Sequence, residues 1–413
     1  MKQTEIGLIP DDWEVKRLGE IGEPCMCKRI LKEQTSPTGD IPFYKIGTFG
    51  GIPDAYISRE LFEQYKEQYN YPKKGTLLLS AAGTIGRVVV FDGKDSYFQD
   101  SNIVWIDNDE TKVTNDFLFY CYSRMQWKTE EGGIVSRLYN ANLKSTSFIA
   151  PKSLAEQERI AKALSDVDAL ISTTEKLIQK KKNIKQGAMQ NLLTGKKRLP
   201  GFGDKQTDLF VPNGTHTKEV KDVSPEQIRL SAKMKQTELG EIPEDWEVKS
   251  LGEMLKIGHG KDYKNLKSGN VPVYGTGGYM TSVNDFLYEG ETVCIGRKGT
   301  IDKPQYHSGK IWTVDTLFYT YDFKSLNPKY LFYKFCLIDW LSMNEASGVP
   351  SLTAKNIEDI QITIPTEEEQ TAIANVLSSM DKEIETLNTN LEKYRNLKTA
   401  MMQQLLTGKI RLG

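Results

Sequence analysis

Cysteine and histidine are scarce in this sequence, and their spacing excludes most metal chemistry. The chain of 413 residues has 5 cysteines, and the one close pair, Cys25 and Cys27, lacks the partners and spacing of a zinc site. The 3 histidines, His216, His259 and His307, stand in unrelated places. We therefore expect reduced thiols and no metal centre.

Long apolar runs and catalytic motifs are also missing. No stretch approaches the ~18 apolar residues of a membrane span, and the first residues lack an apolar segment for secretion, so we expect a cytoplasmic protein without membrane contact. The sequence has no glycine-rich phosphate loop, no nucleophile elbow and no zinc-protease helix. The Asn or Asp followed by Pro-Pro and an aromatic residue that is typical of amino-methyltransferases is absent. We expect no active site and no cofactor in this chain.

Charge of one sign is not in excess, since 54 Lys and Arg face 55 Asp and Glu. The strongly basic composition of many nucleic-acid-binding domains is therefore not present. Basic residues gather in residues 150–199, which include the run Lys180, Lys181 and Lys182. Such a run is as compatible with a solvated helix face as with a binding site.

Two segments occur twice, and they organise the chain. Residues 1–21 and 234–254 are nearly identical, each with Ile-Pro, an acidic pair and a tryptophan, which are Trp13 and Trp246. Residues 156–193 and 369–406 both begin with Glu-Gln, continue with helical periodicity and end in Leu-Leu-Thr-Gly-Lys. The protein is therefore a tandem duplication.

The two long repeats are predicted to be helices of a coiled coil, because their apolar residues recur in alternating steps of four and three. In the second copy only Lys398 breaks the seam, and in the first copy Lys181 and Lys185 interrupt it. The seam residues are Ile160, Leu164, Val167, Ile171, Thr174, Ile178, Ala188 and Leu192 in the first copy, and Ile373, Leu377, Met380, Ile384, Leu387, Leu391, Tyr394, Met401 and Leu405 in the second. Gly195 and Gly408 are placed for left-handed C-terminal caps. Helices of ~55 to 60 Å favour a spacer over the alternative, core helices of a duplicated bundle.

The segments between these repeats diverge, but they share landmarks that indicate one fold. Short strands are predicted at residues 76–80, 87–91 and 103–106, and a helix at 115–125, so each segment is an α+β domain. The predicted organisation is a first globular domain at 1–151, a helix at 152–199, a linker at 200–233, a second globular domain at 234–365 and a second helix at 366–413.

Candidate binding residues lie in glycine-rich loops that carry basic, aromatic and hydroxyl side chains, the types that contact phosphates and base edges. Gly83 and Gly299 each precede Thr-Ile at the end of an apolar strand, and either could equally be a plain hairpin turn. The candidates are Tyr44, Lys45, Ser80, Gly83, Thr84, Arg87, Arg124 and Arg137 in the first half, and Tyr274, Arg297, Lys298 and Thr300 in the second.

The duplicated Ile-Pro-x-x-Trp segments, the divergent Gly-Thr-Ile domains and the repeated Glu-Gln-x-x-Ile-Ala helices resemble the DNA-specificity subunit of type I restriction-modification systems. The resemblance covers nearly the whole chain, and the long linker at 203–233 is the one departure from the family pattern. It implies two target-recognition domains that each bind one half of a split, asymmetric double-stranded DNA site. The paired antiparallel helices would hold these domains apart with pseudo-twofold symmetry.

The resemblance also implies partners. Two methyltransferase subunits would dock on the repeated parts, and restriction subunits would join the complex, which would use S-adenosylmethionine and, for restriction, ATP and Mg. This chain would itself be non-catalytic. The alternative function is a coiled-coil scaffold whose domains bind protein rather than DNA.

Overall fold

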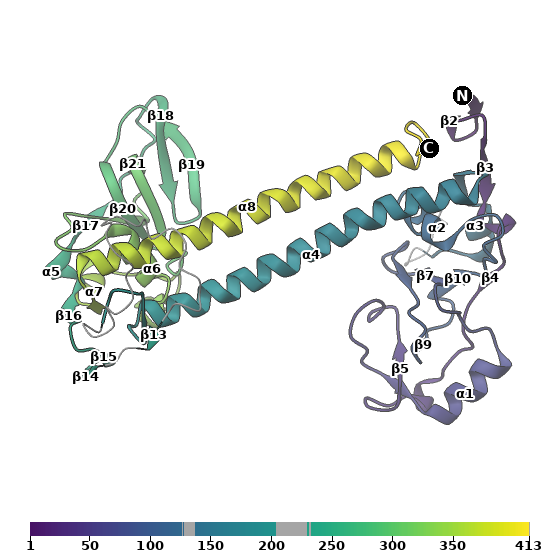
Figure 1. Ribbon diagram of the computed structural model, residues 1–413, viewed down its shortest axis with the longest axis horizontal. Coiled ribbons are helices and arrows are strands. Elements are labelled where there is room, and N and C mark those ends of the chain that lie inside the picture. Colours follow the sequence, from purple (N-terminus) through teal and green to yellow (C-terminus); the bar gives the residue numbers. More distant parts are fainter. Residues whose placement is uncertain (126, 128–136, 204–228, 231–232, 413) are drawn as a thin grey trace, which may run out of the picture. The chain divides into compact units, whose positions relative to one another are not determined.

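The computed structural model describes residues 1–125, 127, 137–203, 229–230 and 233–412 (Figure 1). Contacts divide the chain into two compact units, Met1–Thr174 with Asn390–Gly413, and Glu175–Thr389. Each unit contains one globular domain, the start of the long helix that follows it and the end of the other long helix. Most of the predicted linker at 200–233 lies outside the described residues.

The first unit is a mixed α and β domain. The hairpin of β1 (Lys2–Thr4) and β2 (Gly7–Ile9) precedes β3 (Trp13–Arg17), which pairs antiparallel with β11 (Ser147–Pro151). One sheet has the order β4-β10-β7-β8 and another β6-β5-β9. Their strands are β4 (Pro24–Cys25), β5 (Ile41–Tyr44), β6 (Tyr56–Ile57), β7 (Leu77–Ser80), β8 (Val88–Val90), β9 (Tyr97–Phe98) and β10 (Ile103–Ile106). The short helices are α1 (Arg59–Gln68), α2 (Asn115–Tyr122) and α3 (Asn140–Ser145).

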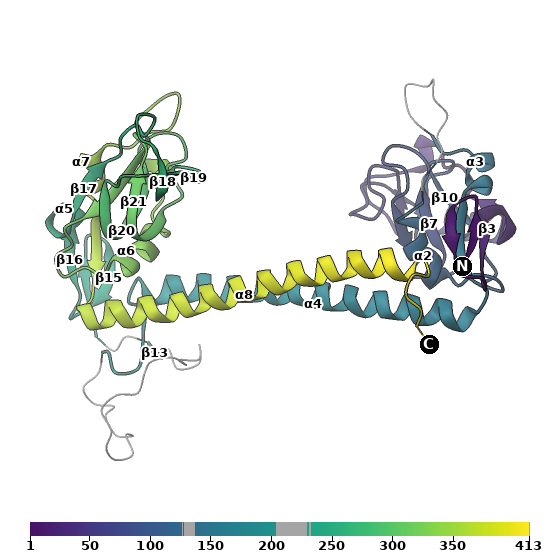
Figure 2. The same ribbon diagram turned by 90° about the horizontal axis from the view of Figure 1, so that it is seen from above.

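The second unit repeats this plan around a single six-stranded sheet of order β17-β22-β20-β21-β18-β19. These strands are β17 (Lys256–His259), β18 (Ser268–Gly275), β19 (Gly278–Val283), β20 (Tyr288–Gly296), β21 (Gln305–Thr313) and β22 (Leu317–Tyr321). The other elements are β12 (Lys197–Arg198), β13 (Arg229–Leu230), β14 (Met234–Thr237), β15 (Gly240–Pro243), β16 (Glu247–Ser250), α5 (Leu251–Met254), α6 (Pro328–Phe335), α7 (Ala354–Glu358) and β23 (Gln361–Ile364). Figure 2 shows α6 between the sheet and α8, where its buried residues join the main hydrophobic core.

The two domains differ mainly in one strand. In the second unit β21 pairs antiparallel with β20 and parallel with β18, whereas in the first unit β8 pairs with β7 and the separate β9 pairs with β5. Between β8 and β9 the chain turns at Gly93, whose φ is +86°. The long strand β21 of the second unit thus corresponds to two short strands, β8 and β9, in the first unit. Its single sheet corresponds to two separate sheets there. The predicted α+β duplication is confirmed.

Local predictions in the first domain are also confirmed, with small differences at the ends. The strands predicted at 76–80, 87–91 and 103–106 are β7, β8 and β10. The helix predicted at 115–125 ends three residues earlier, at Tyr122, because Ser123 donates to the Tyr120 carbonyl and closes the last turn.

The long helices are α4 (Leu154–Leu192) and α8 (Glu367–Leu405), within two residues of the repeats at 156–193 and 369–406. The segments predicted to extend as helix to 199 and 413 end seven and eight residues earlier. Gly195 and Gly408 have φ of +71° and +68°, which confirms the left-handed caps. Within each unit the two helices run antiparallel. In the second unit Lys185 of α4 pairs with Asp381 of α8, and Lys181, one turn earlier, pairs with Glu383.

Most of the predicted seam residues of both helices are buried, the others are half-buried, and the lysines in the seam have partners. The buried members are Ile160, Leu164, Val167, Ile178, Ala188, Leu192, Ile373, Leu377, Ile384, Leu391 and Leu405. Lys181 lies 2.6 Å from Glu383, and Lys398 lies 2.6 Å from Asp168. The interruptions are therefore ion pairs between the helices rather than simple gaps in the packing.

A buried ionic cluster joins the end of α4 to the second domain. Arg198 Nε donates to Glu369 Oε1 at 2.9 Å, and its Nη1 donates to Asp245 at 2.8 Å. The indole of Trp246 donates to the same Glu369, 1% of which is exposed. One carboxylate, that of Glu369 at the start of α8, thus binds both the opening repeat and the residues that follow α4.

The first unit repeats this cluster with residues from the end of the chain. Arg411 donates to Asp12 Oδ1 at 2.9 Å and to Glu156 Oε2 at 2.8 Å. The neighbouring glutamine of each helix fastens its own domain: Gln157 donates to the Pro151 carbonyl, and Gln370 to that of Pro365. The repeated Glu-Gln pair is therefore explained by its contacts.

Candidate nucleic-acid interface

The turn that contains Gly83 in the first domain is stabilised by hydrogen bonds of a buried serine side chain. Ser80, 1% exposed, accepts from the Arg87 amide at 2.9 Å and donates to the Thr84 carbonyl at 2.5 Å. Gly83 has φ of +67°, and Gly83, Thr84 and Arg87 are exposed. The side chain of Ser80 thus shapes the turn, whereas the other three predicted residues are accessible to a ligand.

Other predicted residues of this half surround that turn. The Arg87 guanidinium donates to the Phe49 carbonyl at 2.9 Å, which brings the loop after β5 against the turn. In this loop Lys45 lies 2.9 Å from Asp54, and the ring of Tyr44, which precedes it, stacks on Phe98. Tyr44, Lys45, Gly83, Thr84 and Arg87 therefore belong to one surface.

Arg137 joins this surface from another part of the chain. Its backbone forms a bridge with Ala82, and its guanidinium donates to Asn102 Oδ1 at 2.9 Å. Arg137 follows a segment, 128–136, that lies outside the described residues.

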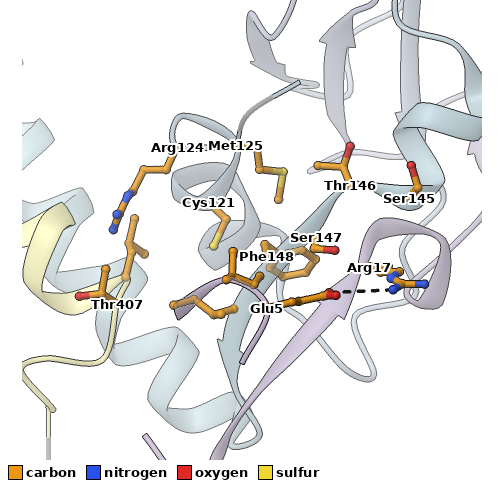
Figure 3. Close-up of a pocket in the computed structure, with 13 residues that line it drawn as sticks. Glu5, Arg17, Cys121, Arg124, Met125, Ser145, Thr146, Ser147, Phe148 and Thr407 are labelled. Atoms are coloured by element: carbon orange, nitrogen blue, oxygen red, sulfur yellow. Dashed lines mark ion pairs between the residues drawn. The ribbon is translucent and has the colours of Figure 1, made fainter. Parts of the chain in front are cut away.

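Arg124 does not belong to this surface. Its guanidinium donates to the Met402 carbonyl near the end of α8 at 3.0 Å. Figure 3 shows Arg124 at a cavity of about 690 Å³ that Cys121, Phe148 and Thr407 also line. The opposite side of this cavity carries Arg17, 3.9 Å from Glu5. Arg124 therefore contributes to the junction of its domain with α8.

The second domain has the same turn with other side chains. Gly299 has φ of +96°, and the Leu352 amide donates to the Arg297 carbonyl at 2.9 Å, as the Leu138 amide donates to that of Ala81. Lys298 forms a backbone bridge with Ser351, the counterpart of the bridge between Ala82 and Arg137. Arg297 and Lys298 are exposed, and the Arg297 guanidinium donates to the Asp315 carbonyl at 3.1 Å.

Arg87 and Arg297, which both lie beside a Gly-Thr-Ile turn, are not structural counterparts. Arg297 is the counterpart of Ala81, since their amides donate to the equivalent carbonyls of Thr316 and Asn102. The counterpart of Arg87 is Lys303, four residues after the turn glycine in both halves. Sequence reasoning missed Lys303, although this shared offset could have revealed it.

Tyr274 and Thr300 lie on the other side of this turn, in a groove of the second unit. The Tyr274 ring stacks on the His307 imidazole with 3.7 Å between centroids. Burial lowers the pKa of His307 to about 4, so the imidazole is neutral at physiological pH. Burial also raises the pKa of the Tyr274 phenol.

Two other kinds of site are absent from the part of the chain that the structure describes. No cluster of three His, Cys, Asp or Glu side chains there could hold a metal ion. No described helix is long and apolar enough to cross a membrane.

Comparison with known proteins gives one consistent result. The model of the family "type I restriction modification DNA specificity domain" matches residues 10–185 and 243–393. A putative type I restriction enzyme specificity subunit of Haemophilus influenzae is 59% identical over 160 residues, which are 39% of this chain and 41% of that protein. The putative MjaX specificity subunit of Methanocaldococcus jannaschii is 28% identical over 100% of this chain and 96% of its own length.

Solved structures agree in fold. The S subunit of a type I restriction-modification system from M. genitalium matches with a TM-score of 0.60 at 15% identity, over 98% of each chain. This likeness extends over both halves of the duplication and the long helices.

Proposed function

Because the chain belongs to the type I restriction modification DNA specificity family, we propose that it is the specificity subunit of such a complex and recognises a bipartite, asymmetric site in double-stranded DNA. One observation carries the bipartite reading. The same backbone turn occurs once in each domain, with Arg87 and Arg137 around the first and Arg297, Lys298 and Lys303 around the second. Because the backbone turn is the same and its side chains differ, the two domains can recognise two different half-sites.

The partners follow from the same proposal. Two methyltransferase subunits would bind the repeated segments, and restriction subunits would join them, in the cytoplasm. This chain would be non-catalytic, and its partners would use S-adenosylmethionine, ATP and Mg. The near-neutral net charge is compatible with DNA binding if the partners contribute phosphate contacts.

Segment exchange tests the bipartite site. Residues 22–151 would be replaced by the corresponding segment of a relative, and the variant would be purified with its methyltransferase. Mapping methylated adenines across a genome should show one half-site changed and the other kept. A simultaneous change of both half-sites would contradict the assignment of one domain to each half.

Arg87 tests the contact surface within one half. If its guanidinium is bidentate to a guanine, Arg87→Ala should weaken binding by ~1 to 3 kcal/mol and relax one position of the first half-site. A phosphate contact would instead weaken binding to all sequences alike. Unchanged affinity and motif would remove Arg87 from the contact surface.

The competing function is a protein-binding scaffold, because long paired helices can equally hold two protein-binding domains apart. A scaffold of this kind predicts that the assembled complex does not bind DNA and therefore does not change its electrophoretic mobility. Sequence-selective binding that weakens with salt would exclude it.

A further inference from the structure

The second unit contains a groove of about 1180 Å³ beside the turn that contains Gly299. One wall comes from the β18–β19 turn and the start of β21, and the other from α6 and the first part of α8. Aromatic rings line much of it, among them Tyr279, Tyr306 and Phe332. All its lining residues belong to the second unit, so it is complete within one compact body.

Three lysines line this groove, each from a different element or loop: Lys303, Lys329 and Lys382. Among the described residues, none of the three has a carboxylate at ion-pair distance, although many other lysines of the chain do. Lys329 Nζ lies 5.3 Å from the centroid of the Tyr306 ring. A cationic face above an aromatic surface is therefore available to an anion.

Acidic groups also reach the groove, and they leave the balance positive. Asp381 is bound by Lys185 and accepts from the Tyr333 hydroxyl at 2.7 Å, so its charge is compensated. Glu385 is the other lining carboxylate. Against it stand the three lysines, which makes the groove more basic than the nearly neutral chain as a whole.

The described residues of the first unit do not provide three cations at the equivalent positions. Strand register and the matching helix starts align Lys303, Lys329 and Lys382 with Arg87, Asp116 and Ala169. Only one of three cations is kept, and one is replaced by an acid. Among the described residues, this set of three cations is therefore specific to the second half.

We propose that this groove binds the sugar-phosphate backbone of one DNA strand next to the second half-site, a contact that the first half does not make. The inference rests on the proposed function as a DNA-specificity subunit. Lysine offers a phosphate a point charge without the bidentate geometry that distinguishes bases. The contact should therefore add affinity without adding sequence information.

Two polar side chains of the groove that could distinguish bases are already engaged within the protein. Gln305 Nε2 donates to the Gly275 carbonyl at 2.9 Å and to that of Thr276 at 3.3 Å. The neutral imidazole of His307 is stacked on Tyr274 and lies 3.2 Å from Gln305 Oε1. Among the described residues, the three lysines are the lining cations without an ion-pair partner, which favours phosphates as ligands.

The test uses the full chain purified with its methyltransferase and duplexes with and without the recognised site, over a range of salt concentrations. Lys329→Ala and Lys382→Ala should each lower the slope of log affinity against log salt by about 0.9, for both duplexes. Lys329→Arg and Lys382→Arg should keep the slope. Lys324→Ala removes an exposed lysine of the same unit outside the groove and should change nothing.

Each result separates the two proposals. Unchanged slopes, with selective and salt-dependent binding by the unaltered complex, would overturn the groove and leave the proposed function standing. A changed methylation motif would assign base recognition to the lysines, and loss of the methyltransferase from the purified complex would assign the groove to that partner; either overturns the backbone contact. If the unaltered complex bound no DNA selectively, the proposed function would itself fail.

Discussion

Lys398 of α8 and Asp168 of α4 form an ion pair, with 2.6 Å between Nζ and Oδ1, at the one position where the second seam lacks an apolar residue. Asp168 also accepts from the Tyr120 hydroxyl at 2.9 Å, so the pair joins both helices to the first domain. The second unit repeats the arrangement with Lys185, Asp381 and Tyr333. A charged residue inside a seam can specify register, because a shifted helix would bury it without a partner.

The pair of Lys398 and Asp168 should show measurable coupling. Because both side chains are about one third exposed, solvent screens the pair, and a double-mutant cycle with alanine at each position should give ~0.2 to 1 kcal/mol. Chemical unfolding of the single and double variants measures it. Coupling indistinguishable from zero would mean that the pair does not stabilise the folded helices.

The buried cluster of the second unit should be far more sensitive than its counterpart. Glu369→Gln leaves Arg198, 5% exposed, with its buried partner neutralised, and should destabilise that unit by ~3 to 5 kcal/mol. Glu156→Gln is the matched control, with a smaller loss expected because the side chain of Arg411 is 40% exposed and can be hydrated. Hydrogen exchange in each unit distinguishes the two. Equal losses would contradict this dependence on burial.

Two glycines of α4 and its cap should respond oppositely to alanine. A Cβ on Gly195 would lie 2.5 Å from Pro243 Cδ, and φ of +71° alone costs an L-residue ~1 to 2 kcal/mol, so Gly195→Ala should destabilise the protein. Gly187 is inside the helix with nothing within 4 Å of the added Cβ, and Gly187→Ala should stabilise by ~0.5 to 1 kcal/mol. Thermal unfolding of both variants checks the signs.

The stability of the second unit should fall in acid because of His307. Its pKa is lowered from 6.5 to about 4 by burial, so the unfolded chain binds the extra proton first and stability is lost as pH falls through this window. His307→Phe keeps a ring against Tyr274, as Phe91 occupies the equivalent position in the first half, and should flatten this part of the curve. Unfolding between pH 4 and 7 tests it; an unchanged slope would exclude His307 as the cause.

The gap between the two half-sites should follow helix length if the helices set it. Seven residues inserted after Thr174 and after Leu387 add ~10 Å and keep the seam in register, which corresponds to about three base pairs of DNA. Both half-site sequences should stay the same while the gap grows, although the accompanying rotation about the DNA axis can reduce the increase. Methylation mapping measures the gap. Insertion in one helix alone should break the pairing and destabilise the protein.

Much of this fold is local in origin and could be predicted from the sequence by itself. The seam of α4 and α8 follows from side-chain periodicity, and their ends follow from Gly195 and Gly408, because helical repeats and left-handed caps depend on neighbouring residues. The duplication follows from direct comparison of the two halves. These features need no knowledge of which distant segments meet.

Tertiary structure decided what each side chain faces. Ser80 lies in a turn whose sequence is typical of a protein surface, yet its side chain is buried. Arg198 pairs with Glu369, which is 171 residues away in the sequence, and no local pattern encodes this pairing. Strand register, which is set by packing of whole sheets, made Lys303 rather than Arg297 the counterpart of Arg87. The sequence determined the elements and the duplication, whereas the surface of each domain depended on long-range pairing between strands.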